Sequence, residues 1–140
     1  MRLEISKKSD LAIRALESLC ASGGSLVGGQ ELAAVMGTST HRVPQIMGPL
    51  IGRGWVDSVP GPKGGYRLSV DIGEISLLQV IDAVEGTIPA DRCVLRGAPC
   101  PSPDPCALHE PWSRAREALL SELDKTPVTE VDCQALQGGG

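Results

Sequence analysis

The stretch QELAAVMGTSTHRVPQIMGPLIGRGWVDSVPGPKGGYRL, residues 30–68, decides the fold. Residues 30–36 are typical of a short helix, and Gly37 follows where glycine is favoured, just past a helix end. A further helix is predicted to run to about Arg53, with side-chain oxygens available to cap it from Thr38, Ser39 and Thr40. Two short helices joined by a tight glycine-containing turn indicate a helix-turn-helix.

A β-hairpin is predicted directly after this helix pair. Residues 55–59 and 66–70 have strand propensity, and the sequence PGPKGG at 60–65 between them is a turn. The hairpin supplies a wing, so the stretch as a whole predicts a winged helix-turn-helix.

Further helices are predicted on both sides of this unit. Residues 6–20 carry apolar side chains at spacings of three and four, which predicts a buried first helix with Leu11, Ala12, Ala15, Leu16 and Leu19 on one face. Another helix is expected from Ser76 to Glu85, ended by Gly86. The last is expected from Pro111, which suits a first helical turn, to about Lys125, and it can pack against a copy of itself.

The predicted fold class is therefore mainly α with a small β-hairpin wing and a long dimerisation helix. The chain divides into a winged helix-turn-helix DNA-binding domain (1–86), a cysteine-rich loop (87–110), a dimerisation helix with a docking segment (111–132) and a disordered tail (133–140). The loop contains no hydrophobic periodicity, and a structureless loop of this length is usually functional or disordered.

The composition narrows the class of protein. A chain of 140 residues with 41% hydrophobic residues supplies one core, and it must be aliphatic because there are no Phe, one Tyr and two Trp. That content leaves no aromatic platform for stacking single-stranded bases. No apolar run is long enough to span a membrane, and the opening MRLEISKKSD lacks the apolar stretch of a signal peptide. We therefore expect a cytoplasmic protein with no membrane partner.

The net charge of −4 conceals an asymmetry between the two halves. Residues 1–67 carry eight Lys and Arg against five acidic residues, so the remaining residues carry a charge of −7. A DNA-binding protein needs a basic surface only where it meets phosphate, and this distribution permits one on the first half.

Three of the five cysteines lie close together in the sequence. Cys93, Cys100, Cys106 and His109 form the pattern C-x6-C-x5-C-x2-H. Soft thiolate ligands select zinc or iron-sulfur clusters. Zinc sites usually carry a C-x2-4-C pair, whereas wider gaps suit an extended iron-sulfur cluster. The spacing by itself therefore leaves both a zinc site and an iron-sulfur site open. A third alternative is that the three cysteines bind no metal. We expect Cys20 to be buried on the apolar face of the first helix and Cys133 to lie in the tail, neither of them a ligand.

The DNA contacts are predicted from docking geometry. The second helix of the pair enters the major groove while the wing tip reaches backbone or minor groove, which selects Thr40, His41, Arg42, Gln45, Lys63 and Gly64. Gln45 can read a base edge, and Arg42 and Lys63 suit phosphate or guanine. The alternatives are a solvated polar face and, for Gly64, a purely structural role in the turn.

The chain also resembles a known family in several motifs. These are MRL at 1–3, SDLAIRAL at 9–16, KGGYRL at 63–68, ISLLQVIDAVEG at 75–86, the cysteine loop, and a closing helix that leads into TPVTEV at 126–131. In these the chain is similar to the Rrf2 family of winged-helix regulators, which includes IscR-like and NsrR-like iron-sulfur repressors. The resemblance implies a homodimer crossed through the long helix, a palindromic operator in double-stranded DNA, and repression that responds to iron, redox state or nitric oxide through the cluster.

The resemblance also implies a ligand set. Cys93, Cys100 and Cys106 match the family's three cysteine ligands. For the fourth ligand, His109 stands where IscR-like members have a histidine, and Asp10 stands where NsrR-like members supply an aspartate from the partner's first helix. Asp10 also suits a first helical turn, and His109 also suits a solvated position before the last helix. Three cysteines slightly favour a 4Fe-4S over a 2Fe-2S cluster, with zinc as the alternative.

Three prolines depart from the family pattern. Pro60 stands where members usually carry Arg before the wing glycine, and Pro44 and Pro49 each remove a backbone donor from the recognition helix. We expect that helix to be kinked or to begin late.

The sequence also argues against two other classes of protein. An iron-sulfur carrier that does not bind DNA would not need the helix pair and wing. An enzyme is not predicted, because the sequence has no nucleophile with a partnered base, no phosphate-binding loop of the G-x4-G-K type, and only two histidines, His41 and His109.

Overall fold

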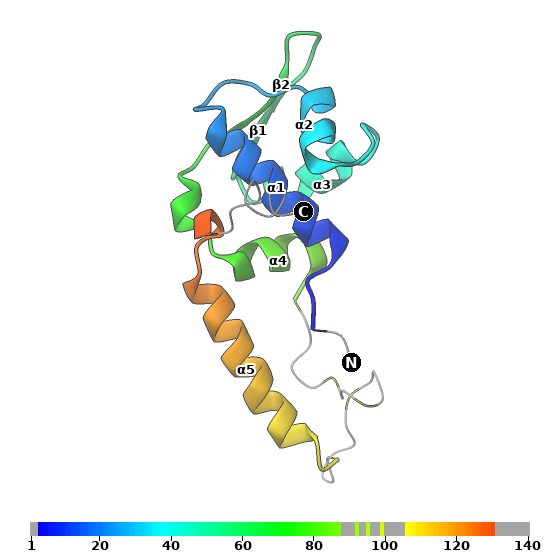
Figure 1. Cartoon of the computed structure of the whole chain (residues 1–140), viewed down its shortest axis with the longest axis vertical. Helices are drawn as coiled ribbons and strands as arrows, with labels where there is room; N and C mark the ends of the chain where they lie inside the picture. The colour runs from blue at the N-terminus through cyan, green and yellow to red at the C-terminus, as the bar shows by residue number, and fades with distance from the viewer. Residues whose placement is uncertain (1–2, 88–91, 93–94, 96–98, 100–105, 131–140) are drawn as a thin grey trace.

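The computed structural model describes residues 3–87, 92, 95, 99 and 106–130. In chain order the elements are α1 (Lys7–Ala21), α2 (Gly29–Met36), α3 (Val43–Gly52), β1 (Val56–Val59), β2 (Gly65–Leu68), the 3₁₀ turn η1 (Ile72–Glu74), α4 (Leu77–Glu85), α5 (His109–Lys125) and the 3₁₀ turn η2 (Val128–Glu130). Helices and one antiparallel hairpin confirm the predicted winged helix-turn-helix architecture (Figure 1).

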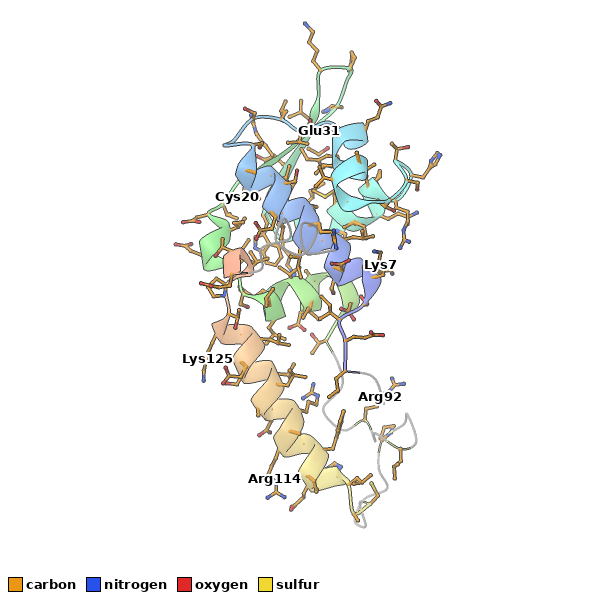
Figure 2. The ribbon with its side chains drawn as sticks, in the orientation of Figure 1. Lys7, Cys20, Glu31, Arg92, Arg114 and Lys125 are labelled. Carbon is orange, nitrogen blue, oxygen red and sulfur yellow. The ribbon has the colours of Figure 1, made fainter. Side chains whose placement is uncertain are left out.

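Helix α1 is the centre of the core. Ser6 caps it by accepting a hydrogen bond from the Ser9 backbone N–H. Its apolar face is buried as predicted, and α2, α3 and α4 all pack against it. The prediction for Cys20 is wrong, because this residue is exposed in the last turn of α1 (Figure 2). It lies at the edge of the apolar stripe, one position past the fully buried Leu19.

The helix pair is present, but its second helix begins later than its capping pattern predicted. Gly37 ends α2 in the left-handed conformation with φ of 71°, as expected of glycine in this position. The prediction that Thr38, Ser39 or Thr40 caps α3 is wrong, because Arg42 is the N-cap residue and makes no side-chain capping bond. Pro44 explains the late start, since a proline is tolerated in the first turn, where its missing N–H has no helical partner.

The wing pairs β1 with β2 in antiparallel register from Val56↔Leu68 to Val59↔Gly65. Both strands are shorter than predicted, although the Ser69 N–H still donates to the Trp55 carbonyl at 2.9 Å beyond them. A third strand contact, which the sequence pattern did not predict, joins Tyr66 to Val27 in the connection between α1 and α2.

The end of α5 is held against the start of α4. The Leu77 N–H donates to the Thr126 carbonyl at 2.9 Å, and the Val128 N–H donates to the Ile75 carbonyl at 2.8 Å. Val128 is fully buried in the same core as α1. From this anchor α5 extends away from the rest of the domain, so that its first turn lies at the opposite end of the molecule from the wing (Figure 1).

None of the helices in the described part of the chain is both long and apolar enough to span a membrane.

Candidate DNA interface and metal site

One side of α3 is turned to solvent, and the predicted recognition residues lie on it or directly before it. Val43, Ile46, Met47 and Leu50 bury the other side in the core. Gln45 is therefore exposed near the start of the helix. Thr40 and His41 are also exposed, but they lie in the turn before α3, and Arg42 is half-buried at the junction. The start of α3 thus presents a polar, partly basic surface.

The wing tip presents Lys63, which is exposed. The turn is closed by a hydrogen bond from the Gly64 N–H to the Gly61 carbonyl at 3.0 Å. A Cβ atom at Gly64 would lie 1.9 Å from the Val59 carbonyl oxygen, so the turn itself requires glycine there. Pro62 fixes the backbone on the other side of Lys63, and the lysine is consequently presented from a constrained turn.

Two further arginines, which the sequence pattern did not single out, lie near α3 and the wing. Arg53 follows α3, and its guanidinium lies 5.8 Å from the centre of the Trp55 ring, within the range of a cation–π contact. Arg67 of β2 lies opposite Asp57 of β1, with Nε 3.9 Å from the carboxylate. The sequence signal for the contact between Arg53 and Trp55 is an Arg-x-Trp pattern directly after a helix.

The two predicted metal ligands at the start of α5 are neighbours. The Cys106 carbonyl accepts a hydrogen bond from the His109 N–H at 3.0 Å, and both residues are half-buried. His109 opens α5, two residues earlier than the predicted start at Pro111. One turn of chain therefore carries a thiol and an imidazole.

The other two cysteine candidates, Cys93 and Cys100, lie outside the described residues. Arg92 and Pro99, which directly precede them in the sequence, form an antiparallel bridge. Among the described residues, no group of three or more His, Cys, Asp or Glu side chains is arranged to hold a metal ion.

Asp10 lies in the first turn of α1, and its carboxylate is already paired. It accepts from Arg14 Nε at 3.2 Å and lies 3.5 Å from Lys7 Nζ. The start of α1 is separated from the first turn of α5, which lies at the far end of the molecule (Figure 1). Within one chain, Asp10 is not brought together with Cys106 and His109.

A family-wide comparison identifies this combination of fold and sequence. The family described as Rrf2, iron-dependent transcriptional regulator, matches residues 5–132. The chain belongs to the Rrf2 family. The predicted resemblance is thus confirmed over most of the chain.

Individual Rrf2 relatives agree with this assignment. The HTH-type transcriptional regulator IscR of Klebsiella pneumoniae is 34% identical over 101 residues, covering 72% of this chain and 61% of the relative. This chain therefore spans less than two thirds of the length of that relative. Its name is that of a transcriptional regulator, in agreement with the prediction that the chain is not an enzyme.

Solved structures with the same fold include two CymR proteins. The structure of CymR, the global cysteine regulator of B. subtilis, has a TM-score of 0.73 at 26% identity and covers 94% of this chain and 100% of that one. The oxidized form of Staphylococcus aureus CymR has a TM-score of 0.70 at 29% identity, and the match covers 90% of this chain and 93% of that one.

Proposed function

We propose that this Rrf2 chain is a transcriptional regulator that binds double-stranded DNA as a homodimer through α3 and the wing. The observation that carries the proposal is the placement of Gln45 and Lys63, each exposed on an element whose other side is held by the core or by a constrained turn. A glutamine offers a donor and an acceptor to a base edge, while a lysine neutralises phosphate.

Fluorescence anisotropy with a labelled duplex from upstream of the chain's own gene tests DNA binding. Gln45→Ala should weaken promoter binding by roughly 1–3 kcal/mol with little effect on an unrelated duplex. Lys63→Ala should weaken binding to both duplexes and lower the salt dependence by about one phosphate contact. Lys125→Ala is the matched control, because Lys125 lies in the last turn of α5 (Figure 2).

Absence of promoter binding by the protein, tested both with and without bound metal, would reject the regulator. If a protein that does not bind the promoter still carried a cluster, the result would favour the alternative function of an iron-sulfur carrier.

We propose further that Cys93, Cys100 and Cys106 hold an iron-sulfur cluster, with 4Fe-4S favoured over 2Fe-2S. The described residues fit such a group, because Cys106 and His109 combine a thiol and an imidazole at one half-buried turn. A bound cluster would supply a group whose stability depends on iron, redox state or nitric oxide. Among the described residues, Cys106 and His109 would supply ligands at the first turn of α5.

His109 is the better supported fourth ligand. It lies one turn from Cys106, whereas Asp10 would have to give up its pairing with Arg14 and Lys7 and reach the cluster from the partner subunit. Native mass spectrometry under anaerobic conditions, which counts iron and sulfide per dimer, decides between them. Cys106→Ala and His109→Ala should lose the cluster, while Asp10→Ala should retain it. Retention by His109→Ala with loss by Asp10→Ala would reverse the assignment.

The CymR relatives support a second candidate, a thiol-based regulator, because one of them is described in an oxidized form. Metal-free protein whose promoter affinity changes reversibly with oxidant and reductant would support that candidate. Zinc detected by elemental analysis, without acid-labile sulfide, would instead support a zinc-stabilised regulator.

A further inference from the structure

The base of the wing is fixed to the chain segment between α1 and α2. The Val27 N–H donates to the Tyr66 carbonyl at 2.8 Å, and the Tyr66 N–H donates to the Val27 carbonyl at 2.9 Å. Val27 is buried, with 4% of its surface exposed. Because the two residues exchange both hydrogen bonds, the contact has the geometry of an antiparallel strand pair. It holds the hairpin close to the start of α2, two residues after Val27.

Gly65 is the residue that allows this contact. Its φ is +150°, a conformation that L side chains rarely adopt, and a Cβ atom built there would lie 2.5 Å from the Val27 carbonyl oxygen. The same atom would lie 2.7 Å from the Val27 carbonyl carbon. Because the clashing atoms belong to the backbone, no side-chain rotation of a neighbour can relieve the clash. A side chain at 65 must therefore push β2 away from Val27.

The neighbouring glycine on the other side of the contact has no such constraint. Gly28 has φ of −69°, and a Cβ atom there would meet nothing within 4 Å. The chain thus offers two glycines at one contact, of which only Gly65 is required by the packing.

We propose that Gly65 is a positioning residue for DNA binding, which sets the angle of the wing relative to α3 so that Lys63 and Gln45 meet one duplex together. Lys63 is two residues from Gly65, at the tip of the wing hairpin whose base is fixed by the contact with Val27. Movement of β2 at this contact is carried directly to the tip. The inference rests on the proposed function, because it concerns the same interface.

A double-mutant cycle on promoter binding tests the proposal. Gly65→Ala should weaken binding by roughly the same factor as Lys63→Ala, on the order of tenfold. Adding Lys63→Ala to Gly65→Ala should cost less than about twofold more, since the displaced lysine no longer contributes. Gln45→Ala should retain its full effect in the Gly65→Ala background. Gly28→Ala, the matched control, should bind like the wild type.

Wild-type affinity of a folded Gly65→Ala protein, or full additivity with Lys63→Ala, would overturn the proposal. Amide hydrogen exchange on the wild type provides a test that does not depend on the variant folding. The Val27 and Tyr66 amides should be protected relative to the Lys63 amide, and equal exchange rates would contradict the contact. Failure of the wild type to bind the promoter would reject the proposed function itself, and this inference with it.

Discussion

Ser76 shows how one hydroxyl links two helices. Its oxygen accepts a hydrogen bond from the Gln79 N–H at 3.1 Å and donates to Asp124 Oδ1 in the last turn of α5 at 3.3 Å. The Gln79 side chain in turn accepts from the Ser76 N–H at 2.8 Å, which completes a capping box. Ser76 is 8% exposed, so water replaces these partners poorly.

Ser76→Ala removes both hydroxyl bonds and leaves a helix start without its cap. We expect the free energy of unfolding to fall by about 1–2 kcal/mol, measured by urea denaturation. Ser121→Ala, on an exposed position of α5, is the control and should change stability by less than about 0.5 kcal/mol. Equal urea midpoints for the two variants would show that the link does not stabilise the fold.

At the scale of the element, α3 contains two prolines with different consequences. Pro44 falls in the first turn, where it is tolerated, whereas Pro49 lies inside the helix. There it removes the N–H that would donate to the Gln45 carbonyl. Gly48 eases the strain, because the residue before a proline is hindered from helical conformation partly through its Cβ, which glycine lacks.

Pro49→Ala restores the missing donor in α3. We expect the free energy of unfolding to rise by at least about 1 kcal/mol, within the cost of about 3 kcal/mol for proline in a helix interior. Thermal and urea denaturation measure the change. Pro44→Ala is the matched control and should have a much smaller effect. A less stable Pro49→Ala protein would show that the packing of the half-buried proline ring outweighs the lost hydrogen bond.

Periodicity predicted which elements exist, and it was less informative about their ends and contacts. The apolar spacing in residues 6–20 located α1, but it misplaced Cys20 because exposure at the edge of a stripe depends on which neighbours cover it. Thr38 to Thr40 had the chemistry of a cap, and the backbone restriction imposed by Pro44 determined the start of α3 instead. The Val27 contact left no local signal, because a single pair of residues has no period.

The sequence predicted which residues are candidates for the metal site, but only partly how they are arranged in space. The pattern of cysteines and His109 named the ligand candidates, and the structure describes the Cys106–His109 turn. The choice between Asp10 and His109 depends on which charges surround each side chain. The pairing of Asp10 with Arg14 and Lys7 is a matter of side-chain geometry that the sequence pattern did not indicate.

At the scale of the whole molecule, α5 packs against α4 and leaves most of its length exposed in the described chain. None of its residues is buried, and Leu119 is 50% exposed. In the proposed homodimer, a second copy of α5 would cover Leu119. The proposed dimer therefore uses this helix.

Leu119→Asp places a charge where the proposed dimer would bury a leucine. We expect a monomer by size-exclusion chromatography with light scattering, because desolvating a carboxylate opposes association. Promoter affinity should fall as well, since two half-sites are no longer bound together. Ser121→Asp is the matched control on the same helix and should remain dimeric. A dimeric Leu119→Asp protein would place the interface elsewhere.

The attachment of α5 at one end makes it a lever. Bonds from Ser76 and Leu77 hold its last turn, and its 17 residues extend about 25 Å from that point. A rotation of about 10° at the anchor moves the first turn, with Cys106 and His109, by about 4 Å. In reverse, a displacement of about 4 Å at the first turn would move the last turn, which lies within about 5 Å of the anchor, by less than about 1 Å. A movement of the proposed ligands would therefore reach α4 as a much smaller displacement of the last turn of α5.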